Sequence, residues 1–432
     1  YGAGLILLVL SLVMLQTASE ASWVRTTGRG LYWLGMAGLV AGIATEIYGF
    51  YLRIRISGWA PVTNMYETVI WVALVAAVLS FIFELIFRRT YSALAGSAVA
   101  LLGTITAVNV PLLDPSIKSL VPVLRSNFWL TIHVLTEVSS YAAFGVAWAL
   151  GLIAMAYYLT ATYRRSPRLA ELALPLIPGI PLLATGAFGT QWATGDLLFY
   201  IFAIMGGIGG MISLGAILAL VGELVNRLRF RETVEGEDAL AREGEFSAET
   251  GAPGFSAASS AALEQRDAPA AIRARAVATP AKLDARGRAM QETALTIKPL
   301  SNFIYRAMQV GVLLIAAGTI LGGVWADYSW GRFWGWDPKE VWALITLLVY
   351  LVPLHGRFAG WVNTFGLAVA SVVCFLSVVM AWYGVNFVLG VGLHSYGFTE
   401  GGSQGLMSMI IAGVLAIPFG AYWRRHLGYR QV

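Results

Sequence analysis

The stretch VIWVALVAAVLSFIFELIF, from Val69 to Phe87, contains a single charged residue, Glu84, among apolar side chains. An α-helix rises about 1.5 Å per residue, so a helix over this stretch would cross a hydrocarbon core of about 30 Å. Segments of the same kind recur along the chain: Gly2–Ala18, Leu31–Leu52, Ser92–Val110, Ile132–Thr160, Leu197–Val225, Val310–Trp325, Val341–Leu354 with its flanks, Thr364–Trp382 and Leu406–Tyr422. The pattern predicts a protein built from membrane-spanning helices.

The composition of the 432-residue chain agrees, because 58% of its residues are hydrophobic and only 12% are charged. Soluble domains keep about a quarter of their residues charged, so this chain has too little polar surface to face water. The predicted fold class is all-α, a polytopic transmembrane helical bundle. The net charge of +5 does not indicate a nucleic-acid partner, because the basic residues lie mostly at helix ends, where they set orientation. The one cysteine, Cys374, lies in an apolar segment, which excludes a disulfide framework and a CxxC metal site.

Basic loops predict the orientation, since short loops rich in arginine and lysine favour the cytoplasmic side. Four such clusters occur, at residues 25–29, 88–89, 164–168 and 424–430. Placing all of them inside predicts about eleven crossings (nine to eleven), with the N-terminus outside and the C-terminus inside. Arg53 and Arg55 lie on the outer side in this scheme and are exceptions to it.

Two regions depart from the regular pattern. The parity of crossings requires residues 172–190 to cross, although they include Pro175, Pro178 and Pro181. We predict a broken helix shielded by its neighbours, with a re-entrant loop as the alternative. Residues 229–299 are charged and poor in large apolar side chains, so they cannot bury enough surface to offset the entropy of ordering. This composition predicts that the region is a cytoplasmic linker between an N-terminal membrane half, 1–228, and a C-terminal membrane half, 300–432.

Tryptophan and glycine are concentrated in the stretch WGRFWGWDPKE. Its tryptophans, Trp330, Trp334 and Trp336, are spaced by Gly331 and Gly335, and glycines at this density favour a loop over a helix. An aromatic belt at the membrane interface is one explanation. The number of tryptophans in one glycine-spaced loop favours a second explanation. In this explanation the loop forms a flat apolar surface that binds a flat apolar ligand.

A helix is expected to follow this loop directly. Asp337 is suited to be its N-cap, Pro338 its first residue and Glu340 the partner in a capping box.

The same stretch resembles the tryptophan-rich WWD motif of haem-handling proteins. Its flanks, GGVWA and VWALIT…VYLVPLH, resemble the CcsA/ResC family of system II cytochrome c assembly proteins, as do PVTNMYET at Pro61–Thr68 and GVNFVLGVGLHSYG at Gly384–Gly397. The resemblance covers most of both membrane halves but not residues 172–298. It implies a haem b site, with haem as transported substrate, made by Trp330, Gly331, Trp334, Gly335, Trp336, Asp337, Pro338 and Glu340.

Two of the four histidines, His133 and His394, lie at outer helix ends and flank the tryptophan loop. An imidazole pair can hold haem iron from both faces. Since they also match the family's outer histidines, the resemblance implies that they are axial ligands of an outer haem. Histidines simply hydrogen-bonded at the interface are the alternative. Glu137, one turn from His133, is a candidate to orient its second ring nitrogen.

His355 lies near the far end of the following helix, about 20 Å deeper. It matches the family's transmembrane histidine, which implies a ligand of an inner haem iron; the alternative is an interfacial histidine near Arg357. His426 lies among arginines, where attraction to anionic lipid headgroups explains it.

The resemblance implies haem delivery and attachment to the CxxCH motif of apocytochrome c, at the outer face of an inner or plasma membrane. The expected partners are haem, apocytochrome c and a ResB/CcsB-type membrane protein, with which the chain would form a cytochrome c synthase. No catalytic nucleophile is expected, because the reacting groups belong to the haem and the substrate thiols. A non-catalytic haem exporter and a haem-binding electron-transfer protein are the alternatives.

Overall fold

The computed structural model describes residues 1–16, 22–111, 113–120, 124–249, 285–389 and 404–430. Within these ranges the chain is helical and contains no strand. The elements are α1 (Gly2–Gln16), α2 (Ser22–Ser57), α3 (Met65–Phe87), α4 (Tyr91–Asn109), α5 (Asn127–Trp129), η2 (Leu130–Val134), α6 (Leu135–Thr160), α7 (Leu169–Ala173), α8 (Leu176–Trp192), α9 (Asp196–Glu249), α11 (Ala285–Trp330), α12 (Pro338–Phe358), α13 (Thr364–Val379), η3 (Met380–Leu389) and α14 (Gln404–Tyr429). The two η elements are π-helical segments.

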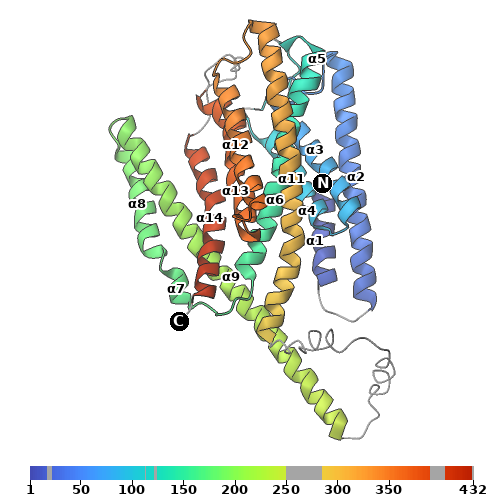
Figure 1. Cartoon of the computed structure of the whole chain (residues 1–432), viewed down its shortest axis with the longest axis vertical. Coiled ribbons are helices and arrows are strands. Elements are labelled where there is room, and N and C mark those ends of the chain that lie inside the picture. The colour runs from blue at the N-terminus through green and yellow to red at the C-terminus, as the bar shows by residue number, and fades with distance from the viewer. Residues whose placement is uncertain (17–21, 112, 121–123, 250–284, 390–403, 431–432) are drawn as a thin grey trace, which may run out of the picture.

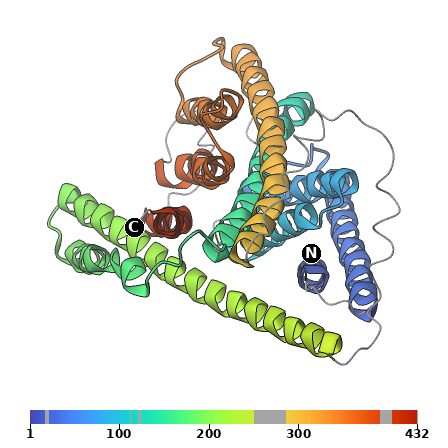
Figure 2. The same ribbon diagram turned by 60° about the horizontal axis from the view of Figure 1, so that its bottom comes forward.

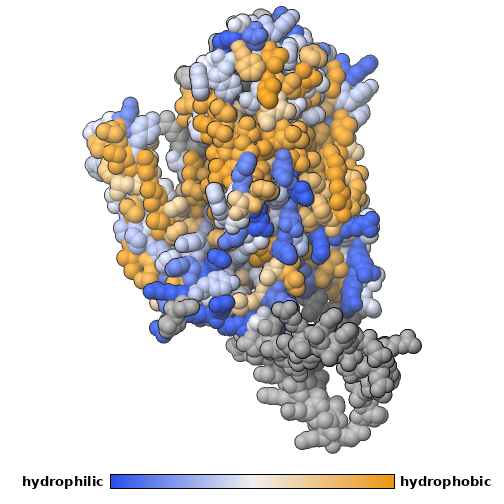
Figure 3. Space-filling view, viewed as in Figure 1, coloured by the Kyte–Doolittle hydropathy of each residue, from blue (hydrophilic) through white to orange (hydrophobic). Residues whose placement is uncertain are grey.

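Among the described residues, nine helices are long and apolar enough to cross a membrane. The shorter apolar helix α1 and the 26-residue α14 coincide with the two remaining predicted segments. The all-α multi-pass membrane fold is therefore confirmed. The number of crossings and the orientation stay predictions. On the face shown in Figure 3, apolar side chains cover a broad area below the top of the bundle, and hydrophilic ones gather at the top and from the middle toward the lower end.

Helix α6 forms the centre of the bundle and packs against α3, α4, α11, α13 and α14 (Figures 1 and 2). Its Phe144 stacks on Tyr350 of α12 with ring centroids 3.7 Å apart. At Gly151 the helix approaches α13 so closely that a Cβ would lie 2.1 Å from Ser371 Oγ. Lipid tails are as apolar as these side chains, so close packing, more than exclusion from water, stabilises the core.

The proline-rich region forms two helices. The chain breaks between α7 and α8, Pro175 is the N-cap of α8, and Pro181 lies inside it. Residues 169–192 are long and apolar enough to span a membrane, but whether they cross it as a broken helix stays a prediction. Helix α8 lies at the edge of the bundle and packs mainly on α9 (Figure 2). There the backbones nearly touch: a Cβ on Gly186 would lie 2.2 Å from the Gly206 nitrogen.

The predicted linker is partly helical at both ends. Helix α9 continues to Glu249 and α11 begins at Ala285. Residues 250–284 lie outside the described ranges, so the linker's place and role stay predictions.

Arg53, an exception to the charge rule, is paired. Its Nε lies 2.6 Å from Glu67 Oε1, and its Nη1 donates to the Pro115 carbonyl at 3.0 Å. The ion pair joins the last part of α2 to the start of α3, and Arg53 stays an exception to the predicted orientation.

A buried ion pair joins α9 to α14. Arg424 Nη2 lies 2.8 Å from Glu223 Oε2, and neither side chain is exposed. Arg227 Nε also contacts Glu223, at 2.9 Å, and the Arg424 guanidinium lies 4.9 Å from the Tyr163 ring centroid. Because Arg424 also donates to the Tyr158 carbonyl of α6, the cluster attaches the peripheral helices to the core.

Candidate functional site

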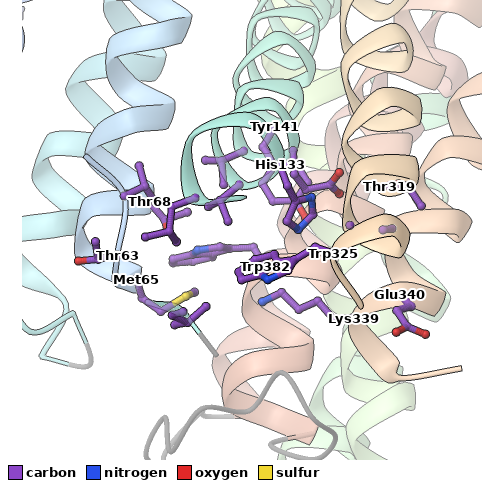
Figure 4. A pocket seen from close by; sticks show the side chains of 18 of the residues that line it. Thr63, Met65, Thr68, His133, Tyr141, Thr319, Trp325, Lys339, Glu340 and Trp382 are labelled. Carbon is purple, nitrogen blue, oxygen red and sulfur yellow. The ribbon is translucent and has the colours of Figure 1, made fainter. Parts of the chain in front are cut away.

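A cavity of about 180 Å³ opens where several elements meet near one end of the bundle (Figure 4). Its walls come from the segment before α3, from η2 and the start of α6, from the last turns of α11, from the tryptophan loop, from the first turn of α12, and from η3. Most of the lining is apolar. The polar exceptions include His133, Glu137, Lys339 and Glu340, so the cavity combines one imidazole with charged groups of both signs.

His133 lies in η2, on the cavity wall. Its Nδ1 lies 2.9 Å from the Gly318 carbonyl oxygen of α11. A carbonyl can only accept, so in a neutral imidazole this contact places the proton on Nδ1 and makes Nε2 the acceptor nitrogen of the ring. The ring fits because α11 carries glycine at the contact: a Cβ on Gly322 would lie 2.6 Å from His133 Cε1. Trp325 meets the imidazole edge-on, with centroids 5.6 Å apart.

Glu137 was a candidate to orient His133, but it does not do so, because the Gly318 carbonyl makes the contact with His133 Nδ1. Both Glu137 carboxylate oxygens are buried and make no hydrogen bond to a described residue. The carboxylate packs against α11, where a Cβ on Gly318 would lie 2.3 Å from Oε2.

The tryptophan loop comprises Gly331–Asp337. Trp330 was expected in this loop but is the last residue of α11, because Gly331, with φ +66°, ends the helix. Trp334 lines the cavity, whereas Trp336 is 72% exposed and meets Trp334 edge-on at 6.0 Å. Of the three tryptophans predicted to form a flat apolar surface, Trp334 alone is in the described lining of the cavity.

The start of α12 is as predicted. Asp337 is the N-cap, Pro338 is the first helical residue, and Glu340 completes the capping box. Glu340 Oε2 also accepts from the Gly335 backbone at 2.8 Å, which folds the loop back onto the helix. Gly335 allows this path, because a Cβ there would collide with the Arg332 guanidinium. Gly335 and Glu340 thus shape the loop, and Glu340 also lines the cavity.

Several cavity residues had not been predicted individually. Thr63 donates from its backbone and hydroxyl to Glu67 Oε2, at 2.7 and 2.6 Å, which fixes the segment before α3. Trp382 enters from η3, and Lys339 enters from α12 (Figure 4). Lys339 lies in WGRFWGWDPKE and Thr63 lies in PVTNMYET. Both residues therefore belong to stretches whose family resemblance could have pointed to them.

The other histidines are separate from the cavity or outside the description. His355 is exposed near the end of α12, with Nδ1 2.8 Å from the Leu351 carbonyl oxygen. His426 stacks on Tyr422 and Trp423 near the end of α14. His394 lies in the segment 390–403, outside the described residues. Within the described part of the chain, no cluster of three or more His, Cys, Asp or Glu side chains could hold a metal ion.

The cavity lies within the part of the chain that matches a known family. The family described as "Cytochrome C assembly protein" matches residues 62–394. The chain belongs to this family. Relatives named "Cytochrome c biogenesis protein CcsA" also match the chain. The family match and these relatives together confirm the CcsA/ResC resemblance at the family level.

Three such relatives illustrate how far the similarity extends along the chain. The protein of Synechococcus sp. (strain RCC307) is 49% identical over 107 residues, 23% of this chain and 32% of the relative. That of Nostoc punctiforme is 28% identical over 344 residues, 79% of this chain and 82% of the relative. That of Synechococcus sp. (strain WH7803) is 32% identical over 260 residues, 60% of this chain and 67% of the relative. The strongest local matches thus span about a third of the relatives' length.

Proposed function

We propose that this protein works in cytochrome c biogenesis and presents haem b, as a substrate, in the cavity beside His133 for attachment to apocytochrome c. The observation that carries the proposal is that His133 and Trp334 line one cavity, although they are far apart in sequence. An imidazole can bind the iron axially, and tryptophan offers flat apolar area to a flat apolar macrocycle. The proposal draws further support from membership of the cytochrome c assembly family.

In this proposal each group of the chain has a defined task. The Gly318 carbonyl holds the His133 ring through Nδ1, and Nε2 is the nitrogen that would bind iron. Trp334 and Trp325 cover the macrocycle and exclude water. His394, Trp336 and the remaining loop residues complete the site, with His394 as the second axial ligand. The same site then faces outward from an inner or plasma membrane.

The attachment reaction needs no nucleophile from this chain. Each CxxCH thiol adds across a haem vinyl group: a C–S bond forms, and the thiol hydrogen ends on the other vinyl carbon. No electrons are lost or gained overall. The chain supplies orientation and shielding, and a ResB/CcsB-type protein is the proposed partner.

His355 is proposed to hold haem at a second, inner position. Its ring lies on the exposed face of α12, in line with the exposed side chains of Leu348 and Val352. An imidazole on an apolar outer face is costly unless it has a partner. A helix of the partner protein would supply the second ligand.

The test is co-expression with the partner and an apocytochrome carrying CxxCH, followed by haem staining of the cytochrome and absorption spectra of the purified membrane protein. His133→Ala and His394→Ala should each change the spectrum and stop attachment, and added imidazole should partly restore both. His426→Ala is the matched control and should behave as wild type. Wild-type spectra in both His133→Ala and His394→Ala would refute the proposed ligands. Haem retained but never attached would favour a carrier or electron-transfer role.

A further inference from the structure

Lys339 places a cation on the wall of an otherwise largely apolar cavity. It lies in the first turn of α12, and both it and Trp382 line the cavity (Figure 4). Its Nζ donates to Asn386 Oδ1 at 2.6 Å. Asn386 is 1% exposed and is itself held by η3, where its Nδ2 donates to the Trp382 carbonyl. The ammonium is therefore positioned by a buried amide that has no charge to balance it.

The acidic groups nearby, Asp337 and Glu137, attract the ammonium but form no ion pair with it within 4 Å in the described structure. Asp337 accepts from the Lys339 backbone nitrogen at 3.0 Å as the helix cap. Glu340 accepts from the loop backbone and pairs with Arg332 at 3.2 Å. Glu137 also lines the cavity and forms no ion pair with Lys339 within 4 Å in the described structure. Among the described residues, no carboxylate is thus paired with this ammonium.

An ammonium has three donors, and the bond to Asn386 is the only hydrogen bond that this one makes to a described residue. A half-buried charge with unused donors is costly unless an anion or water meets it. Because the cavity is lined by an imidazole and by tryptophan, its occupant is expected to be largely apolar, with an anionic edge.

We propose that Lys339 is the carboxylate-binding residue of this cavity, and that Asn386 positions its ammonium. The inference rests on the proposed function: with haem as the substrate, the bound group is a propionate. An imidazole on the iron leaves the macrocycle free to rotate about the iron–nitrogen bond. A second contact at the edge removes that freedom. The vinyl groups lie on the edge opposite the propionates, so a propionate at Lys339 turns the reacting vinyl edge away from it.

The experiment compares iron protoporphyrin IX with its dimethyl ester, which lacks both negative charges. Each is titrated into the purified full-length protein in detergent, and binding is followed by absorption. Wild type should prefer the free acid by about tenfold or more, as expected for a hydrogen bond to a charged group. Lys339→Met should abolish this preference, and Lys339→Arg should keep most of it.

The matched control is Lys118→Met, because Lys118 is exposed and pairs with Asp114 in the loop after α4. It should show the wild-type preference. If Lys339→Met does not fold, Lys339→Gln removes the charge while keeping a donor for Asn386. The ester partitions more strongly into detergent than the free acid does. The ratio of acid binding to ester binding in the Lys339 variant measures this effect, so the wild-type ratio is compared with it.

The outcomes separate this inference from the proposed function. Equal binding of acid and ester by wild type, or a full preference in both Lys339→Met and Lys339→Gln, would overturn the role of Lys339 and leave haem binding intact. Binding of neither compound would overturn both.

Discussion

Gly322→Ala is the sharpest test of how His133 is held. The new Cβ would lie 2.6 Å from Cε1, 3.1 Å from Nδ1 and 3.2 Å from Nε2 of the imidazole. Ordinary contact begins near 3.4 Å, so the ring must withdraw by almost 1 Å. Such a shift breaks the 2.9 Å contact with the Gly318 carbonyl, which is worth about 1 kcal/mol, and displaces Nε2. Overpacking adds about 1–3 kcal/mol.

Iron ligation depends more steeply on this displacement than folding does, because a metal–nitrogen bond tolerates only a few tenths of an ångström. Gly322→Ala should therefore insert and express near normally, yet show an altered haem spectrum and at least about tenfold weaker haem binding. Exogenous imidazole should recover the spectrum, since it fills the vacated position without needing the side chain.

Gly207→Ala in α9 is the matched control, because nothing lies within 4 Å of the Cβ position there. It should match wild type or be slightly more stable, as alanine favours a helix over glycine by about 1 kcal/mol. A Gly322→Ala protein with the wild-type spectrum and haem affinity would refute the idea that His133 is a ligand held by α11.

Trp334→Ala should weaken haem binding by about tenfold or more and Trp336→Ala by less, because Trp334 lines the cavity and Trp336 is 72% exposed. If haem titrations show equal and small losses in both variants, the loop is better explained as an aromatic belt at the membrane interface. His355→Ala should lower the amount of haem that reaches the outer site in pulse-labelled membranes and be rescued by imidazole, whereas wild-type delivery would leave His355 an ordinary interfacial histidine. Arg424→Met leaves the unexposed Glu223 without its main partner and should cost about 3–5 kcal/mol, while the double change Glu223→Leu with Arg424→Met should recover most of the loss in thermal unfolding. Equal stability of the single and double variants would contradict a coupled pair.

The sequence predicted those parts of the structure that depend on local patterns. Apolar length located the helices, and the Asp-Pro-Lys-Glu run placed the start of α12, because hydrocarbon thickness and N-capping act over a few neighbouring residues. The structure places His133 and Trp334 in the lining of one cavity, and their role toward haem stays a prediction.

What was missed depends on contacts between distant segments. The Gly318 carbonyl replaces Glu137 beside His133 because glycines bring α11 and α6 close, and only the fold sets that distance. In the sequence Lys339 is an ordinary lysine in the first turn of a helix. Its contact with Asn386 of η3 is seen only in the folded structure. The crossing by residues 172–190, the cytoplasmic place of the linker and the role of His394 stay predictions.

The cavity has a π-helical segment on two of its walls, η2 with His133 and η3 with Trp382. A wide turn of this kind holds one residue more than an α-helical turn, and one residue corresponds to about 100° of rotation. Residues on the two sides of each segment can thus face directions that one continuous α-helix could not give them. Deletion of a single residue from η2 would therefore turn His133 away from the cavity while α6 kept its packing register. Insertions and deletions of one residue, more than substitutions, are the changes by which such a site could be gained or lost without rebuilding the bundle.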